Sequence, residues 1–258
     1  MSPGEIKLFS GNVDIDLHLY ADYHGWVQPL GKRNIQIIYY PLQKRTDGWD
    51  KFFVLNNFCL AEANKLYPGR GHIVTPYFDD SNFYLLPKKR QVINIGHYFI
   101  EEDQHSKNQH FVIDWFQKQN YYESLILHGK LTHPDYYNFL VQIINNDPRI
   151  QINYNKTQDV IRADLAQSMI MVHAIGYGRT NPAQTEHFGL VAVEALLSGC
   201  QPIVHNSGGC KDIPGVITYN DFSEIPVISE TDPLKLREIG QTFNTSITEQ
   251  QILKALNG

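Results

Sequence analysis

Cysteine is scarce in this chain of 258 residues. The three cysteines are Cys59, Cys200 and Cys210. An odd number without a Cys-x-x-Cys spacing argues against a disulfide framework and against a zinc site. The closest histidines stand five residues apart, which does not fit the four-residue spacing of a helical zinc pair. We therefore expect a protein of a reducing compartment, with no disulfide and no bound metal.

The sequence also lacks an excess of positive charge and a long apolar run. The formal net charge is -5, so no basic surface is available to neutralise the phosphates of a nucleic acid. No run approaches the roughly 18 apolar residues that a membrane helix needs. The first five residues, Met-Ser-Pro-Gly-Glu, do not have the basic and apolar pattern of a signal peptide. These absences predict a cytoplasmic protein with no transmembrane segment, and they leave peripheral contact with a membrane open.

The first third of the chain alternates strands with one helix. Strict alternation of apolar and polar residues predicts a strand at residues 13–20, and further strands are expected at residues 35–40, 51–55 and 73–74. Asn56 or Asn57 caps a helix that Pro68 ends. Pro87 stands beside three basic residues and marks a hinge, so we place a domain boundary there. The expected domains are residues 1–86 and residues 87–258.

The second domain has a regular βαβ order. Strands are expected at residues 91–96, 125–129, 150–152, 169–172 and 216–218, and helices at residues 111–119, 136–144, 160–167, 233–240 and 248–256. This order predicts a parallel sheet that binds ligands at the carboxyl ends of its strands. His173 stands at one such end, where it serves either a ligand or the fold.

The most informative segment follows at residues 186–204. Glu186 lies in a polar loop, and a short helix opens at Phe188, Gly189 and Leu190 before a buried strand. The amide end of a helix, next to a residue without a Cβ, is a place that a phosphate can approach closely. The segment therefore favours an anionic ligand, although a solvated loop carboxylate is an alternative for Glu186.

The short helix carries a second carboxylate. Leu190, Val193 and Leu197 share one face, which predicts that this face packs on a sheet. Glu194 lies among these apolar residues and needs hydrogen-bond donors there. Either a lysine or arginine of the protein or a ligand with hydroxyl groups supplies them, and sugars carry such hydroxyls.

This segment resembles the Glu-x7-Glu signature of retaining family 4 glycosyltransferases of the GT-B fold. Besides Glu186-His187-Phe188-Gly189-Leu190 and Glu194, the resemblance includes Gly176-Tyr177-Gly178, the loop at Pro182 and Gly208-Gly209, in the order and spacing of those enzymes. It covers residues 88–258 well and the earlier part loosely. The implied fold is α/β and GT-B-like, with Rossmann-type parallel sheets, a complete C-terminal lobe and a truncated N-terminal lobe.

The resemblance also implies a reaction and a donor site. A hexose passes from a nucleoside-diphosphate sugar, with uridine or guanosine as the base, to a hydroxyl of a glycan or glycolipid, without a metal. Glu194 accepts hydrogen bonds from the ribose, and Glu186 engages hydroxyls of the donor sugar. The amides of Phe188, Gly189 and Leu190 hold phosphate and sugar.

The implied diphosphate clamp departs from the family pattern. Gly96 ends the first strand of the second domain, His97 stands where the family has an arginine, and Lys107 takes the place of its lysine. Glu186 and Lys107 are the implied catalytic residues, and His173 joins the donor site. A solvated lysine is the alternative for Lys107. The loop at residues 153–158 is expected to hold the nucleobase.

Other functions are weighed against this one. The short first domain and His97 also fit a nucleotide-sugar-binding module, or half of a two-chain enzyme, that lacks transferase activity alone. A partner chain, a homodimer or a compact site at residues 22–26 would then complete the acceptor site. An NAD-dependent enzyme is disfavoured, because no Gly-x-Gly-x-x-Gly follows a predicted strand.

Overall fold

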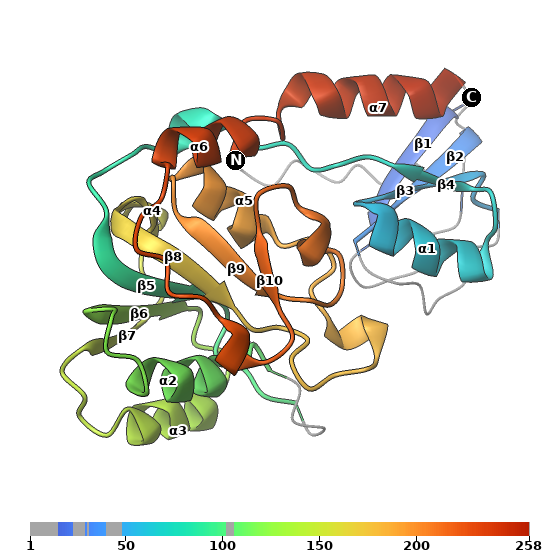
Figure 1. Ribbon diagram of the computed structural model, residues 1–258. Helices are drawn as coiled ribbons and strands as arrows, with labels where there is room; N and C mark the ends of the chain where they lie inside the picture. Colours follow the sequence, from blue (N-terminus) through green and yellow to red (C-terminus); the bar gives the residue numbers. More distant parts are fainter. Residues whose placement is uncertain (1–14, 23–28, 30, 40–47, 102–105, 258) are drawn as a thin grey trace.

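The structure is a computed structural model that describes residues 15–22, 29, 31–39, 48–101 and 106–257. Within these residues the strands form two parallel sheets (Figure 1). The α/β class and the Rossmann-type sheets predicted from the sequence are confirmed. Most of the loop at residues 22–26, considered above as an acceptor site, lies outside the described residues.

The first sheet has the order β1-β2-β3-β4 and is parallel throughout. Its strands are β1 (Ile15–Asp22), β2 (Gly31–Ile38), β3 (Lys51–Val54) and β4 (Gly71–Ile73). Helix α1 (Asn57–Leu66) joins β3 to β4, and the side chain of Asn56 caps it by accepting a hydrogen bond from the Cys59 amide at 2.9 Å. The predicted cap is confirmed at Asn56. We call β1–β4 with α1 the first lobe.

The second sheet has the order β10-β9-β8-β5-β6-β7. Its strands are β5 (Lys89–Ile95), β6 (Ser124–Gly129), β7 (Ile150–Tyr154), β8 (Ser168–His173), β9 (Gln201–His205) and β10 (Ile217–Tyr219). The chain runs outward from β5 to β7 and then returns to β8 on the other side of β5. Between β5 and β8 the strand order therefore reverses, and such a switch point is where open α/β sheets bind ligands.

Helices cover both faces of the second sheet. One face packs against α2 (Gln109–Gln117) and α3 (Pro134–Ile144), and the other packs against α4 (Gln158–Gln167), α5 (Leu190–Leu197) and α6 (Pro233–Gly240) (Figure 1). The short 3-10 turns are η1 (Asp80–Asn82), η2 (Pro182–Gln184), η3 (Cys210–Asp212) and η4 (Phe222–Glu224). We call β5–β10 with α2–α6 the second lobe. Strands β6, β8 and β9 are buried on both faces, which explains why each contains a short apolar run, whereas the edge strands β7 and β10 also have exposed residues.

The last helix, α7 (Thr245–Asn257), leaves the second lobe and lies along the first sheet (Figure 1). Ala255 packs with Ile35 and Phe53, and the Lys51 Nζ donates to the Ala255 carbonyl at 2.6 Å. The sequence predicted this helix but grouped it with residues 87–258. The boundary at residue 87 stays a prediction, and β5 begins close to it. None of the helices in the described ranges is long and apolar enough to span a membrane.

Candidate functional site

A cleft of about 800 Å³ opens at the carboxyl ends of the central strands of the second sheet. The residues that line it come from the ends of β5, β6, β7 and β8, from the loops before α2 and α5, and from α4 and α5 themselves: Ile95, Gly96, His97, Phe99, Lys107, Gly129, Lys130, Asn155, Lys156, Gln158, Ile161, His173, Glu186, Leu190, Val191 and Glu194. Seven of the nine residues predicted for the donor site are among them. The cleft thus lies at the switch point between β5 and β8, as the topology requires.

Glu186 forms an ionic cluster with Lys107 and His173. Its Oε2 lies 3.3 Å from His173 Nε2 and 3.6 Å from Lys107 Nζ, and its side chain is 20% exposed. Burial alone raises the pKa of the Glu186 carboxyl, but the charge of Lys107 and the contact with His173 outweigh it and hold the pKa well below its ordinary value. Glu186 is therefore a carboxylate at neutral pH and can only accept hydrogen bonds.

Buried amide side chains fix the segment that carries Lys107. Asn108 Nδ2 donates to the Ala174 carbonyl at 2.9 Å, and Gln109 Nε2 donates to the carbonyls of Gly96 and His97 at 3.1 Å each. Both amides are almost fully buried. Since these bonds tie the start of α2 to the ends of β5 and β8, Lys107 is directed into the cleft from an ordered backbone. This fixed setting disfavours the interpretation of Lys107 as a merely solvated lysine.

Residues with basic side chains follow three neighbouring strands at the cleft. His97 follows β5, Lys130 follows β6 and Lys156 follows β7, and all three are exposed. Burial and the charges of Lys107 and Lys130 lower the pKa of His97, so at neutral pH its ring is uncharged. Lys130 was not predicted from the sequence, although it directly follows the predicted strand at residues 125–129. Lys156 was predicted only as part of the loop at residues 153–158, of which Asn155 and Gln158 also line the cleft.

Helix α5 begins at the cleft. Its N-cap is Gly189, with φ of 94° and no side chain to cap the helix. A Cβ at this position would collide with the Cys210 Sγ, so both the backbone and the space require glycine. Val193 and Leu197 are fully buried as predicted, but Leu190 is 51% exposed. The prediction that Leu190 packs on the sheet was wrong, because the first turn of α5 projects into the cleft.

Glu194 lies one turn further along α5. Burial raises its pKa to about 6, and the positive charge of Arg162 acts in the opposite direction. No salt bridge to Glu194 is present in the described part of the chain. A half-buried carboxylate at the cleft wall is therefore a candidate acceptor for hydrogen bonds from a ligand.

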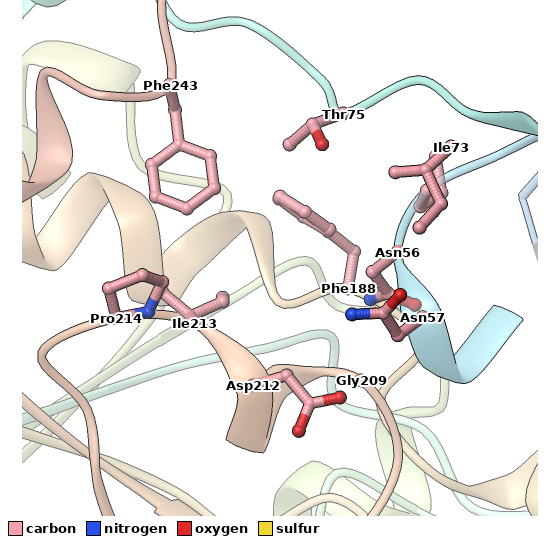
Figure 2. Close-up of a pocket in the computed structure, with 11 residues that line it drawn as sticks. Asn56, Asn57, Ile73, Thr75, Phe188, Gly209, Asp212, Ile213, Pro214 and Phe243 are labelled. Carbon is pink, nitrogen blue, oxygen red and sulfur yellow. The ribbon is translucent and has the colours of Figure 1, made fainter. Parts of the chain in front are cut away.

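Phe188 and Gly189 are the two predicted residues that do not line the cleft. The Phe188 side chain is buried on the opposite side of the loop, with its ring 6.0 Å from that of Phe243. It faces a smaller niche of about 150 Å³ between the lobes, which Asn56 and Thr75 also line (Figure 2). At Phe188, only the backbone can serve a ligand in the cleft. Among the described residues no cluster of three or more His, Cys, Asp or Glu could hold a metal ion.

The comparison with known families agrees with this geometry. The family described as Glycosyl transferases group 1 matches residues 85–215, just over half of the chain. The chain therefore belongs to the group 1 glycosyltransferases. The two Rossmann-type sheets and the cleft at the switch point agree with this class of enzyme. No curated protein matches the chain.

Solved structures show the same fold at low sequence identity. Anabaena Alr3699/HepE in complex with UDP has a TM-score of 0.66 and 15% identity, over 87% of this chain and 72% of that chain. AviGT4, a glycosyltransferase involved in avilamycin A biosynthesis, has a TM-score of 0.67 and 14% identity, over 95% and 74%. Sucrose-phosphate synthase from Thermosynechococcus elongatus has a TM-score of 0.67 and 16% identity, over 87% and 68%. These neighbours share the GT-B fold with this chain.

Proposed function

We propose that this protein transfers a hexose from a nucleoside-diphosphate sugar to a hydroxyl of a glycan or glycolipid, with retention at the anomeric carbon. The observation that carries the proposal is the ionic cluster of Glu186, Lys107 and His173 on one wall of a cleft that also holds Glu194. Glu186, Lys107 and His173 can bind a sugar and its phosphate, and Glu194 can accept hydrogen bonds from the ribose. Structures of Alr3699/HepE contain UDP and UDP-glucose, so UDP-glucose is the donor to test first.

Each group has a separate role in this proposal. Glu186 accepts hydrogen bonds from hydroxyls of the donor sugar, and Glu194 accepts them from the ribose. The amides at Phe188, Gly189 and Leu190 face the phosphate, and Lys107 pairs with it. When the sugar leaves, negative charge grows on the diphosphate, and both Lys107 and the amide end of α5 stabilise it. The reaction then needs no metal.

A specific observation supports a second candidate, a nucleotide-sugar-binding module or half of a two-chain enzyme. The cleft residues all come from the second lobe, whereas the first sheet contains four strands in the described residues. Correct placement of an acceptor can supply roughly 7 to 11 kcal/mol of barrier reduction, and a facing lobe has to provide it. For this candidate we expect the chain alone to bind a donor but to transfer it poorly. A partner chain or a homodimer would complete the acceptor site.

Radiolabelled UDP-glucose distinguishes the two candidates. The monomeric chain, verified by light scattering, is incubated with the donor and a set of glycan and glycolipid acceptors, and hydrolysis and transfer are counted separately. Slow hydrolysis without transfer supports the module. Transfer over many turnovers by the monomer supports the complete enzyme, and an anomeric configuration that is inverted in the product would contradict retention.

A further inference from the structure

Asn56 connects the first lobe to the loop that carries Glu186. Its Oδ1 accepts from the Cys59 amide at 2.9 Å and so caps α1. Its Nδ2 donates to the His187 carbonyl of the second lobe at 2.7 Å. The amide oxygen of Asn56 thus makes a hydrogen bond within the first lobe, and its amide nitrogen makes one to the second lobe.

The residue that Asn56 contacts is held from several directions. Cys59 Sγ lies 3.6 Å from the same carbonyl, and the rings of Phe58 and His187 stack at 6.3 Å. On the other side, the Gly209 amide donates to the Glu186 carbonyl at 2.8 Å. A Cβ on Gly209 would collide with the Asn56 amide and the His187 carbonyl, so the close approach requires glycine.

Consecutive residues of this loop therefore face three different surroundings. Glu186 points into the cleft, the His187 carbonyl meets Asn56, and Phe188 packs on Phe243. Figure 2 shows Asn56 at the start of α1, with the Phe188 ring directed toward Phe243. A carbonyl that is fixed one residue after Glu186 limits the rotation of the backbone from which the carboxylate projects.

We propose that Asn56 is a positioning residue for Glu186. Asn56 acts through the His187 carbonyl and fixes the position of the Glu186 carboxylate in the cleft. There the carboxylate can accept hydrogen bonds from hydroxyls of a donor sugar. The part of this inference that concerns the donor sugar rests on the proposed function. The hydrogen bond from Asn56 to the His187 carbonyl, which we call the bridge, does not depend on it. Without the bridge, the loop keeps its place in the fold and loses its fixed distance from Lys107 and His173. The affinity for an intact nucleotide sugar then falls, while the affinity for the free nucleotide does not.

Three variants separate the bridge from the helix cap. Asn56→Asp keeps an oxygen that can cap α1, but it has no donor for the His187 carbonyl and adds a negative charge. Asn56→Ser also keeps a capping oxygen and adds no charge, but its side chain is too short to reach the His187 carbonyl. Asn57→Asp is the matched control, because it adds the same charge one residue further along. Asn57 is exposed and makes no hydrogen bond to His187 in the part of the chain that the structure describes.

The first measurement is hydrogen exchange of peptides that cover residues 186–190, without ligand. We expect faster exchange in Asn56→Asp and Asn56→Ser than in the wild type and Asn57→Asp, with α1 peptides unchanged. Equal exchange in all four proteins would overturn the inference, whether or not any nucleotide binds. Faster exchange of the α1 peptides in both Asn56 variants would show a role in the helix alone, and would also overturn it.

The second measurement is calorimetric titration with UDP and with UDP-glucose. One hydrogen bond corresponds to roughly a three- to tenfold change in affinity, and we expect that loss for UDP-glucose only, in both Asn56 variants. An equal loss for UDP and UDP-glucose would overturn the positioning role. If the wild type binds neither, the proposed function fails and the sugar part of the inference fails with it, while the exchange experiment still decides the bridge.

Discussion

Glu186 and Glu194 lie on the walls of one cleft but in opposite electrostatic environments. The pKa of Glu186 is held well below its ordinary value by Lys107 and His173 despite burial, whereas burial raises that of Glu194 to about 6. Two carboxylates whose pKa values are driven apart commonly have separate roles in one site. Here Glu186 stays ionised at neutral pH beside Lys107 and His173, whereas Glu194 becomes mostly ionised only as the pH rises above 6.

The first prediction concerns the pH dependence caused by Glu194. A ribose hydroxyl donates best to the ionised carboxylate, so UDP affinity should rise as the pH increases from 5 to 7.5. With a pKa of about 6, the ionised fraction changes by about tenfold over this range, and so should the affinity. Glu194→Gln should abolish this rise, as measured by calorimetry in buffers of constant ionic strength, and leave only the opposite trend that His97 causes below pH 6.5. A pH profile that is the same in the wild type and in Glu194→Gln would remove Glu194 from the nucleotide site.

Removing the Glu194 carboxylate altogether should cost more. Loss of a charge-assisted hydrogen bond corresponds to roughly 1.5 to 3 kcal/mol, or about ten- to hundredfold in affinity. We therefore expect Glu194→Ala to weaken UDP binding by this factor at pH 7.5, with a melting temperature that is not reduced because a desolvated charge disappears. An unchanged dissociation constant in the folded variant contradicts the assignment to the ribose.

The second prediction separates sugar from nucleotide at Glu186. Glu186→Gln removes a charge 3.6 Å from Lys107 and replaces one of the two oxygens that can accept from sugar hydroxyls by an NH2 donor. UDP affinity should stay the same or increase, since Lys107 loses a competing anion. Affinity for UDP-glucose should fall roughly ten- to hundredfold, as expected for loss of a charged hydrogen bond. A parallel loss for both ligands would mean that Glu186 contacts the nucleotide.

The third prediction tests His97, which stands at the expected position of a cationic clamp. Because burial, Lys107 and Lys130 lower its pKa, the wild-type ring becomes charged only below the usual 6.5. In the Glu194→Gln background, His97→Arg should strengthen UDP binding at pH 7.5. The difference should shrink as the pH falls below 6.5, because the histidine then becomes cationic as well. If the ratio of the UDP affinities with arginine and with histidine at position 97 does not change between pH 5 and 8, His97 lies outside the clamp.

The fourth prediction concerns the two lysines that the sequence analysis did not single out. Lys130→Ala and Lys156→Ala should each weaken UDP binding by about two- to fivefold at low salt, since exposed charges contribute under about 1 kcal/mol. The loss should largely disappear at 1 M salt, where screening acts within about 3 Å. Lys118→Ala is the control, because this lysine pairs with Asp114 on α2 and does not line the cleft. Equal effects in all three variants would indicate a general charge effect.

Much of the fold follows from local sequence patterns. Strands β6, β8 and β9 of the second sheet contain short apolar runs between polar turns, and burial on both faces leaves few other structures for such runs. Asn56 or Asn57 was predicted to cap α1, and the structure has Asn56 in this role. Glu186, Gly189 and Glu194 were recognisable because loop, glycine and helix occur in one continuous segment.

Contacts between distant segments could not be predicted in this way. Periodicity identified the segment at residues 248–256 as a helix, but only packing of Ala255 against Ile35 and Phe53 places α7 on the first sheet. The direction of Phe188 depends on Phe243, and the exposure of Leu190 depends on the cleft.

The sequence by itself determined the class of the protein, the parallel sheets and the order in which the cleft residues Glu186, Leu190 and Glu194 follow one another, because these depend on spacing along the chain. The tertiary structure decided which polar and charged side chains lie close together. The pairing of Glu186 with Lys107 and His173, the row of His97, Lys130 and Lys156, and the bridge from Asn56 all join separate elements. The strand order brings them to one edge of the sheet, and no local propensity specifies that order.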